Sequence, residues 1–542
     1  MLFNSYEFIF VFLPATLAIF FLLGRASRNL ALGWLIIASL LFYAWWRPVN
    51  VLIILTSLLT NFVFAQLLLR VAADKTKVRA GQVVLGLGIT FNIVFLGYFK
   101  YANFLQSAMN DFAGTDFVLT QIILPLGISF FTFQQIAFLI DVHGRNIRTF
   151  APRDFFLFVL FFPQLIAGPI VHFREMIPQF LSSSCRFNRE HFSVGLTLFL
   201  FGLFKKVVLA DGIAPHVTPI YELAASGSSV SLFPAWIAAI GFTLQIYFDF
   251  SGYSDMAAGL GRCVGVRLPL NFDSPLKASN IIDYWSRWHI TLTRFLTAYV
   301  YNPLALWQTR KRMAKGLPGL RGRSSSTGAF LKVLAAPTVF TMFLSGLWHG
   351  AGYLFILWGI LHGVYLAINH AWRLVGPQLW SSKDRYERFM RPAGLLITFI
   401  SVTVAMILFR STSVEAAVEL LKGLFGLNGI SLPREILERS GLLNVLGSIV
   451  SVSDTQSATE FVLANAWILM LLLIALLLPN SVQIMARYEP VLGVKQLTPD
   501  NGRLARVLAW NPTIPWAVVM AALAAAAIMR LGGESEFLYW QF

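Results

Sequence analysis

Long apolar stretches, nearly free of charge, alternate along this sequence with short segments rich in lysine and arginine. A helix of about 20 apolar residues crosses the hydrocarbon core of a bilayer, and roughly 11 to 13 such stretches recur here. The first four are expected at residues 8–24, 29–46, 50–69 and 82–99. The pattern predicts an all-α, polytopic membrane protein.

One apolar stretch is interrupted by residues that break helices. FFPQLIAGPIVHF contains Pro163, Gly168 and Pro169. Irregular backbone at membrane depth is tolerated only where it is buried in protein or lines a cavity. We therefore expect a re-entrant or sharply kinked segment here, and an ordinary proline kink is the simpler alternative.

A second segment changes character from apolar to amphipathic. It begins at Asn271 and reads NFDSPLKASNIIDYWSRWHITLTRF. Such a pattern predicts an interfacial or re-entrant helix that approaches the membrane from the cytoplasmic side. His289 would lie on that helix, on the same face as Trp285 four residues earlier.

Composition and charge support the membrane assignment. The chain is 57% hydrophobic and 13% charged, whereas a soluble globular chain is about 25% charged. The formal net charge of +16 would suggest a nucleic-acid partner in a soluble protein. Here the basic residues cluster in alternate loops, as in cytoplasmic loops of membrane proteins, so no nucleic acid is expected.

The same charge pattern predicts a topology. The basic loop 308–328 is expected in the cytoplasm, the segment 411–460 outside, and both termini outside, which is the periplasm in a bacterial inner membrane. The two cysteines, Cys185 and Cys263, form neither a disulfide framework nor a metal-binding pattern.

A few charged residues lie within or beside apolar stretches, among them Lys205, Lys206, Asp249 and Asp255. Charges in such places face other helices, snorkel to the interface, or pair with one another. A spacing of six residues separates the two carboxylates by about 120° on a helix, which is unfavourable for sharing a proton. Structural pairing with lysine or arginine is the predicted role.

The segment 333–372 holds no Asp, Glu, Lys or Arg, yet contains His349, His362 and His370. An ionisable side chain in hydrocarbon is costly unless paired, which makes each of these histidines a candidate site residue. The alternative for each is a structural histidine bonded to a backbone carbonyl. We expect His362 and His370 to be structural.

Metal and serine chemistry receive no support from the motifs. No HExxH, paired-cysteine cluster or G-x-S-x-G occurs. On one continuous helix His349 and His362 would lie about 140° apart, so they would not converge on a metal without a break. A histidine beside a tunnel does suit proton abstraction from a hydroxyl, because its unperturbed pKa lies near neutrality. No metal and no bound cofactor are predicted.

Several long motifs in order resemble those of the membrane-bound O-acyltransferase family, in its bacterial polysaccharide branch. They are WHGAGYLFILWGILHG, DYWSRWHITLTRF, FFPQLIAGPIV, QIYFDFSGYSDMA and the opening MLFNSYEFIFVFLP. The resemblance implies that His349 is the catalytic histidine and that His289 is the polar residue of the second segment. It further implies substrate contacts by Trp285, Arg287, Trp348, Asp249 and Asn271.

The resemblance also implies a fold and a reaction. The fold is a ring of tilted helices with re-entrant segments around a central tunnel, formed by a single domain over 1–542 with a catalytic core at about 118–372. Such a ring would bring His349 deep into the protein, whereas a simple two-span hairpin would place it nearer a turn. The reaction is acyl transfer across the inner membrane from a cytoplasmic donor such as acetyl-CoA or another activated acyl carrier.

The expected partners are a periplasmic acetyltransferase of the SGNH type or an acyl carrier, other polysaccharide biosynthesis or export subunits, and the lipid bilayer. Two other functions stay open from the sequence. One is a transporter of a polysaccharide or lipid-linked precursor, which shares broken helices and intramembrane charge. The other is an acyltransferase that acts on a lipid or a peptide.

Overall fold

The computed structural model describes residues 1–74, 76–118, 122–320, 326–440, 450–453, 457–494, 507–533 and 538. Within them, nine helical segments are long and apolar enough to cross a membrane. These are Phe8–Ala26, Val49–Val71, Val78–Ala113, Arg189–Ala225, Leu232–Cys263, Thr327–His349, Tyr353–Leu379, Lys383–Arg410 and Ala458–Leu477. The predicted all-α, multi-pass membrane protein is confirmed, since a helix satisfies its own backbone hydrogen bonds in hydrocarbon.

The chain divides into two compact units. The first comprises Met1–Phe204, Gly252–Asn271 and Ser481–Gly533, and the second comprises Lys205–Ser251, Phe272–Asn480 and Glu534–Phe542. The helix α12 (Leu232–Cys263) contributes to both. The single domain over 1–542 stays a prediction.

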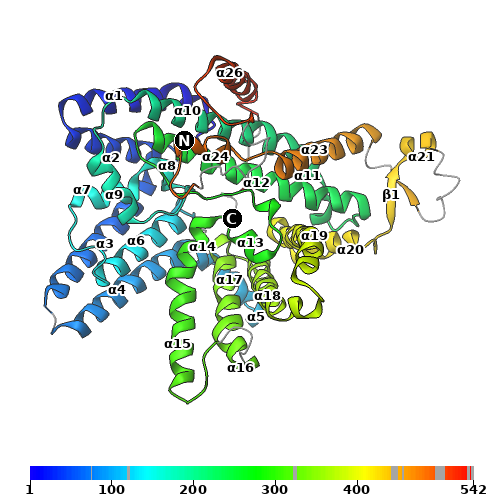
Figure 1. Ribbon diagram of the computed structural model, residues 1–542, viewed down its shortest axis with the longest axis horizontal. Helices are drawn as coiled ribbons and strands as arrows, with labels where there is room; N and C mark the ends of the chain where they lie inside the picture. The colour runs from blue at the N-terminus through cyan, green and yellow to red at the C-terminus, as the bar shows by residue number, and fades with distance from the viewer. Residues whose placement is uncertain are drawn as a thin grey trace. The chain divides into compact units, whose positions relative to one another are not determined.

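The first unit begins with paired helices. Ser27 separates the first two, and its side chain accepts a hydrogen bond from the Asn29 N–H to cap the second helix. These two helices lie side by side (Figure 1). The helices of this unit are α1 (Leu13–Ala26), α2 (Arg28–Ala44), α3 (Val49–Ala73), α4 (Val78–Leu96), α5 (Ala102–Ala113), α6 (Ile128–His143), α7 (Pro152–Leu160), α8 (Phe162–Leu165), α9 (Phe173–Ser182), α10 (Arg189–Phe204), α24 (Ser481–Ile484) and α26 (Ile514–Ile528).

A reciprocal amide pair joins α3 to α4. Asn61 Nδ2 donates to Asn92 Oδ1 over 3.2 Å, and Asn92 Nδ2 donates back to Asn61 Oδ1 over 2.6 Å. Both side chains are buried. Polar groups of this kind fix the contact between membrane helices, because an unpaired amide in hydrocarbon is costly.

The interrupted apolar stretch is buried, with irregular backbone, as its sequence predicts. The short helix α8 ends at Leu165, and the chain then runs without regular structure to His172. Residues 162–171 are all buried. Ser39 on α2 accepts a hydrogen bond from the Phe162 N–H over 3.0 Å, which satisfies a buried backbone N–H at the start of α8.

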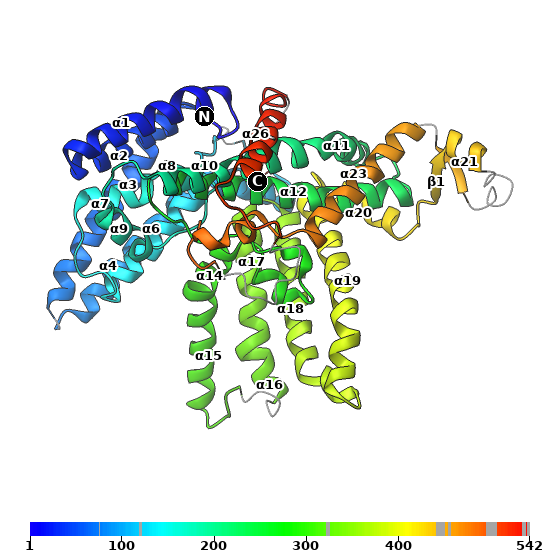
Figure 2. The same cartoon turned by 45° about the horizontal axis from the view of Figure 1, so that its top comes forward.

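The second unit contains the long helices that carry the candidate histidines. Figure 2 shows α15, α17, α18 and α19 running side by side. The elements of this unit are α11 (Asp211–Ala225), α13 (Ile281–Trp285), α14 (Ile290–Leu296), α15 (Asn302–Met313), α16 (Thr327–Ala329), α17 (Ala336–His349), α18 (Tyr353–Val375), α19 (Lys383–Arg410), α20 (Val414–Leu424), α21 (Arg434–Ser440), α23 (Ala458–Leu477), and the parallel strands β1 (Ile430–Pro433) and β2 (Val450–Ser453).

The helices α17 and α18 pack closely through glycine. A Cβ on Gly346 would lie 2.2 Å from the Phe355 carbonyl oxygen, and a Cβ on Gly359 would lie 2.4 Å from the Met342 carbonyl oxygen. Only glycine lets the two backbones approach this far, as at small-residue contacts between membrane helices generally. This close packing therefore fixes the turn between His349, where α17 ends, and Tyr353, where α18 begins.

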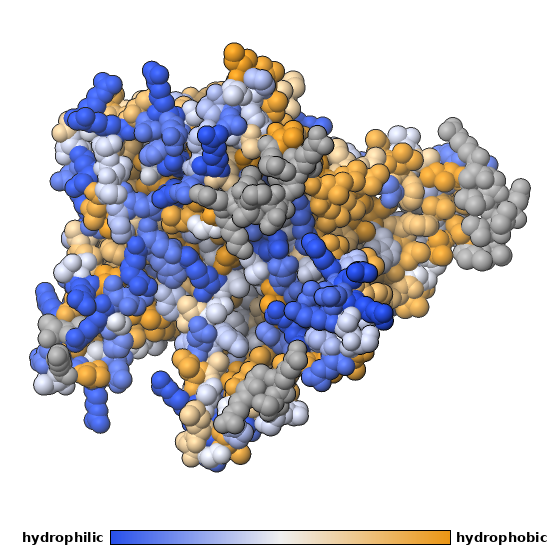
Figure 3. Space-filling view, viewed as in Figure 1, coloured by the Kyte–Doolittle hydropathy of each residue, from blue (hydrophilic) through white to orange (hydrophobic). Residues whose placement is uncertain are grey.

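Apolar side chains on α23 face outward. Val462, Leu463, Leu469, Leu473 and Leu477 are each at least 48% exposed. Figure 3 shows hydrophobic surface over this helix. Such a continuous apolar face suits contact with lipid tails rather than with water.

Two segments expected to be loops contain regular structure. The basic segment 308–328 starts within α15, which continues to Met313 because its last turn favours basic residues, and residues 321–325 lie outside the described part. The segment 411–460, expected outside, contains α20, β1, α21 and β2 among its described residues. Ser413 caps α20 by accepting from the Ala416 N–H over 3.1 Å.

The glycine contact of the hairpin gives a stability test. In Gly359→Ala the new methyl group would overlap the Met342 carbonyl oxygen, so we expect a loss of about 1–3 kcal/mol from overpacking. Thermal unfolding of the detergent-solubilised protein, followed by size-exclusion chromatography, measures it. The control is Gly352→Ala in the same hairpin, whose Cβ would meet only the Phe355 ring at an ordinary 3.6 Å. Equal unfolding temperatures for both variants would contradict the expectation.

Candidate active site

His349 is the last residue of α17 and is only 4% exposed. The next residue, Gly350, has an extended backbone, and a Cβ there would lie 2.2 Å from the Phe355 ring. The chain turns at this point and returns as α18. His349 therefore lies beside the turn and is also buried, because the close packing of the hairpin encloses it.

His289 lies between α13 and α14 and is fully buried. Its φ of 44° and ψ of 52° are left-handed, a conformation that residues other than glycine rarely adopt. Strained backbone of this kind is concentrated at functional sites. The helix α13 ends at Trp285, so the prediction that Trp285 and His289 share one helical face is wrong. The left-handed residue separates two short helices and ends the helical repeat.

The fold brings these two histidines together. Their ring centroids are 6.4 Å apart, with an angle of 57° between the ring planes. They come from segments that are distant in the sequence and belong to the same unit. One small polar group placed at the pair would contact both imidazoles, which is the geometry that proton transfer to a bound reactant requires.

Aromatic rings enclose the pair. Phe250 and Trp348 lie 4.8 Å and 5.7 Å from the His289 ring, centroid to centroid. Trp358 and Phe409 lie 5.1 Å and 5.2 Å from the His349 ring. Rings of this kind keep water out and so strengthen every polar interaction inside the site. Burial also lowers the pKa of His289 to about 3, which leaves this imidazole neutral at physiological pH.

A second histidine of the hairpin has a structural contact. His362 Nδ1 accepts a hydrogen bond from the Trp285 indole N–H over 3.3 Å. This contact ties α18 to α13 at Trp285, four residues before His289. The result agrees with the predicted structural role of His362, with an indole as its partner in place of a carbonyl.

Several buried polar groups near the pair are available to a ligand. Among the buried atoms without a hydrogen-bond partner in the described part of the chain, four lie on the segments around the pair: Tyr284 Oη, Ser345 Oγ, Trp358 Nε1 and His362 Nε2. Buried polar atoms are almost always satisfied by protein, water or ligand. Because His362 Nδ1 accepts a hydrogen bond from Trp285, the ring proton of the neutral imidazole lies on Nε2, which is therefore a donor. Together these groups suit a substrate rich in oxygen.

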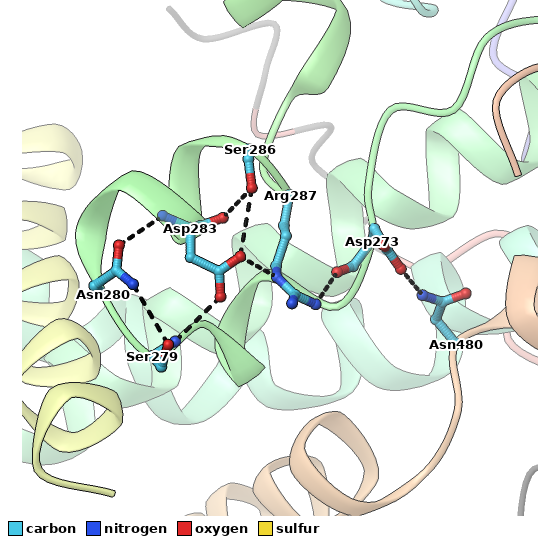
Figure 4. Close-up of polar contacts among 7 residues, drawn as sticks. All are labelled: Asp273, Ser279, Asn280, Asp283, Ser286, Arg287 and Asn480. Carbon is cyan, nitrogen blue, oxygen red and sulfur yellow. Dashed lines mark hydrogen bonds and ion pairs between the residues drawn. The ribbon is translucent and has the colours of Figure 1, made fainter. Parts of the chain in front are cut away.

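Arg287 belongs to a network that fixes the segment leading to His289. Its Nε donates to the Asp283 carboxylate over 2.7 Å, and its Nη1 donates to the Asp273 carbonyl oxygen over 3.4 Å. Asn480 Nδ2 in turn donates to the Asp273 carboxylate over 3.2 Å. Figure 4 shows these contacts as one continuous set. Arg287 thus has two protein partners, and its contact with substrate stays a prediction.

Of the two carboxylates on α12, Asp249 pairs with a lysine as predicted, whereas Asp255 accepts a hydrogen bond from the Ser481 hydroxyl. Lys206 Nζ lies 2.7 Å from Asp249 Oδ1 and 2.7 Å from Asp211 Oδ1. Lys206 and Asp249 are almost completely buried. A buried charge is tolerated only with a partner of opposite sign, so structural pairing of Asp249 is confirmed. Its contact with substrate stays a prediction.

Asn271 lies in the first unit, where its Nδ2 donates to Ser254 Oγ over 3.1 Å. The histidine pair, Trp285, Arg287, Trp348 and Asp249 all lie in the second unit.

Among the residues that the structure describes, no group of three or more His, Cys, Asp or Glu side chains is placed to hold a metal ion.

Three residues of the aromatic shell were missed from the sequence, and the first is Phe250 on α12. Trp358 lies four residues before His362 on α18, and this spacing is a signal that would have placed both on one face. Phe409 lies near the end of α19, and nothing in its local sequence predicts that its ring meets His349.

Comparison with known proteins finds a family similarity over the part of the chain that carries His289. The sequence model of the MBOAT, membrane-bound O-acyltransferase family matches residues 82–316, a range that includes His289. The peptidoglycan O-acetyltransferase of Helicobacter pylori is 38% identical, over 82% of this chain and 83% of that protein. This chain belongs to the membrane-bound O-acyltransferase family. It is therefore an O-acyltransferase and a multi-pass membrane protein.

Two further relatives show the breadth of this family. The probable alginate O-acetylase AlgI of Pseudomonas aeruginosa is 37% identical, over 78% of this chain and 75% of that protein. The teichoic acid D-alanyltransferase of Streptococcus thermophilus is 26% identical, over 52% of this chain and 68% of that protein. The resemblance to the bacterial polysaccharide branch is thus confirmed.

The low pKa of His289 predicts a pH response for this acyltransferase. Because burial keeps the ring neutral above about pH 3, His289 should not contribute an acid limb to the rate between about pH 5 and 8. We expect His289→Asn to lower the rate severely while leaving the shape of the rate–pH profile unchanged. Profiles of acetyl transfer for both proteins test this. Loss of an acid limb in the variant would contradict it.

Proposed function

We propose that this membrane-bound O-acyltransferase moves acetyl groups from a cytoplasmic donor across the inner membrane, for O-acetylation of an exopolysaccharide or a cell-wall glycan. The observation that carries the proposal is the buried pair of His289 and His349, whose rings are 6.4 Å apart inside an aromatic shell. The names of the relatives, which act on peptidoglycan and alginate, support acetyl as the group and a glycan as its destination.

In the proposed reaction His349 is the general base. It takes the proton of the acceptor hydroxyl while the hydroxyl oxygen forms a bond to the acetyl carbonyl carbon of a thioester donor. The carbon–sulfur bond then breaks, and the leaving thiolate receives the proton from His349. His289, which is neutral, positions the donor or the acceptor. Acetyl-CoA or another activated acyl carrier fits this chemistry as the donor, and no bound cofactor takes part.

A relay to a second protein completes the proposal. A hydrophilic polymer would have to enter an aromatic site in which His349 is 4% exposed. The outer segment 411–460 contains no histidine, so it offers no Ser-His-Asp triad for a transfer to glycan. We therefore assign the final step to a periplasmic acetyltransferase of the SGNH type or to an acyl carrier, which would work with other polysaccharide biosynthesis or export subunits.

The role of His349 gives the main test of the reaction. His349→Ala should lower acetyl transfer by about 10²- to 10⁴-fold or more, because a positioned general base contributes that much. The control is His370→Ala, which alters a half-buried histidine on α18 outside the aromatic shell. Radiolabelled acetyl transfer in membranes, at matched protein levels, measures both. Substantial transfer by a correctly inserted His349→Ala protein would overturn the proposal.

The proposed topology is tested by labelling. Ser381 lies in the basic segment 373–391, which the charge pattern also predicts in the cytoplasm, and Ser451 lies in the segment 411–460, predicted outside. In a background without Cys185 and Cys263, single cysteines at these positions should therefore lie on opposite sides of the membrane. Both positions are exposed. An impermeant thiol reagent should therefore label only the Ser451→Cys protein in intact cells, and both proteins after permeabilisation. Labelling of both in intact cells would refute the assignment.

The relay has its own measurement. The purified protein in liposomes, supplied with acetyl-CoA, should not acetylate polymer until the periplasmic partner is added. Acetyl groups should appear on that partner, and they should be absent when His349→Ala replaces the wild-type protein. Acetylation of polymer by this protein alone would show that it acts directly on the glycan.

A further inference from the structure

A polar cavity of about 530 Å³ opens at the surface of the first unit and contains none of the residues of the histidine site. Its walls come from the end of α9, the loop that follows, the start of α10 and the end of α12. Ser182, Arg186 and Asn188 of these walls are exposed, so a ligand can enter from outside. Three arginines, three serines and two side-chain amides favour an anionic group rich in oxygen.

Arg262 is the buried cation of this cavity. The residue is 7% exposed, and its Nε has no hydrogen-bond partner among the described residues. Its ion-pair partner, Glu190, lies 3.8 Å away and is 62% exposed, so solvent screens this contact. A buried guanidinium requires stronger compensation, and an anion in the cavity would provide it.

The end of α12 that carries Arg262 is fixed by close packing against α10. A Cβ on Gly259 would lie 2.5 Å from the Gly195 carbonyl oxygen, and a Cβ on Gly195 would lie 2.6 Å from the Gly259 carbonyl oxygen. Beyond the helix, the Gln179 side chain accepts from the Arg267 N–H over 2.9 Å and donates to the Arg267 carbonyl oxygen over 3.0 Å. The walls are therefore held in place before a ligand binds, which lowers the entropic cost of binding.

The two other arginines of the cavity differ in their pairing. Arg267 forms an ion pair with Glu489. Arg186 has no ion-pair partner among the residues that the structure describes, and its side chain is exposed. Arg186 and Arg262 therefore leave an excess of positive charge in the cavity.

The cavity loop rests on the end of a membrane helix. The Cys185 carbonyl oxygen lies so close to Gly24 that a Cβ there would have no room. Gly24 lies near the end of Phe8–Ala26, a segment long and apolar enough to cross a membrane. Arg28, in the turn that follows, donates to the Leu181 carbonyl oxygen. The charge pattern predicts this turn in the cytoplasm, so the cavity lies level with the headgroups of that leaflet.

Exposed apolar side chains border the polar walls. Phe187 lies between two residues that line the cavity and is 53% exposed. Its ring lies 5.5 Å from that of Phe21 on α1, centroid to centroid. Leu181 of the cavity loop and Leu22 of α1 are also exposed. A polar cavity that borders the apolar face of a membrane helix matches a molecule with a charged head and apolar chains.

We propose that this cavity binds the phosphate headgroup of an anionic phospholipid from the leaflet on the predicted cytoplasmic side. The guanidinium groups of Arg186 and Arg262 hold the phosphate, and the serine hydroxyls and amides bind the hydroxyl groups of a glycerol head. The acyl chains lie over Phe187 and α1. A soluble phosphate compound shares the headgroup chemistry but leaves the apolar border uncovered. Basic pockets beside membrane helices attract anionic lipids in the same way.

Native mass spectrometry of the detergent-solubilised protein measures lipid binding directly. Dioleoyl phosphatidylglycerol should bind about tenfold more tightly than zwitterionic dioleoyl phosphatidylcholine, because only the first adds a net negative charge. Arg186→Gln and Arg262→Gln should each weaken phosphatidylglycerol binding by about five- to tenfold, because each removes one cation from the phosphate. The matched control is Arg189→Gln, which alters an exposed arginine at the start of α10 that does not line the cavity and should bind as the wild type does.

Unchanged phosphatidylglycerol affinity in a correctly folded Arg186→Gln protein would overturn the proposal, whether or not the buried Arg262 variant folds. Equal affinity of the wild type for the two lipids would also overturn it. Inorganic phosphate and glycerol 3-phosphate separate the lipid from a soluble source of phosphate. Neither should displace phosphatidylglycerol at equal concentration. Displacement by either would show that the cavity prefers a soluble phosphate compound, and the assignment to a lipid would be wrong.

Discussion

The close contact between α17 and α18 is the constraint on which the site depends. Two backbones approach at Gly346 and Gly359 more closely than any side chain would allow. This contact buries His349 at the end of α17, although the residue lies beside a turn. In a membrane, where hydrophobic burial does not drive one helix onto another, such packing supplies much of the association energy. The buried position of His349 is therefore a consequence of helix packing.

Polar contacts then select which segments meet this hairpin. The indole of Trp285 donates to His362 and ties α13 to α18. Arg287, held by Asp283 and the Asp273 carbonyl, fixes the chain just before His289. Each of these groups would be costly if left unpaired in an apolar interior, so the contacts favour one arrangement over others. His289 can keep its left-handed backbone because its neighbours hold it on both sides.

The chemistry follows from this enclosure. Aromatic rings around the two histidines exclude water, and burial keeps the His289 imidazole neutral. A neutral imidazole can accept or donate a hydrogen bond to a reactant without a competing charge, which suits transfer of an acyl group between oxygen and sulfur. Among the charged residues of the membrane region, Lys206 and Asp249 pair with each other.

The sequence by itself determined the membrane class, the positions of most helices, the buried broken segment at 162–171 and the family. These features depend on the local periodicity of apolar residues and on motifs that are continuous along the chain. The sequence also identified His349 as a candidate site residue, because the segment 333–372 around it contains no Asp, Glu, Lys or Arg. The sequence also predicted that Asp249 pairs with a lysine or an arginine, because a buried charge requires a partner of opposite sign, but it did not identify which residue.

Only the tertiary structure decided which residues meet. The contact of His289 with His349, the choice of Lys206 for Asp249 and the arrival of Phe409 beside His349 all join segments that are distant in sequence. The left-handed break at His289 was also invisible, since helical spacing assumed a continuous helix through Trp285. Local patterns encode how much of a residue is buried. The partner that buries it depends on long-range packing, which has no signature in the neighbouring residues.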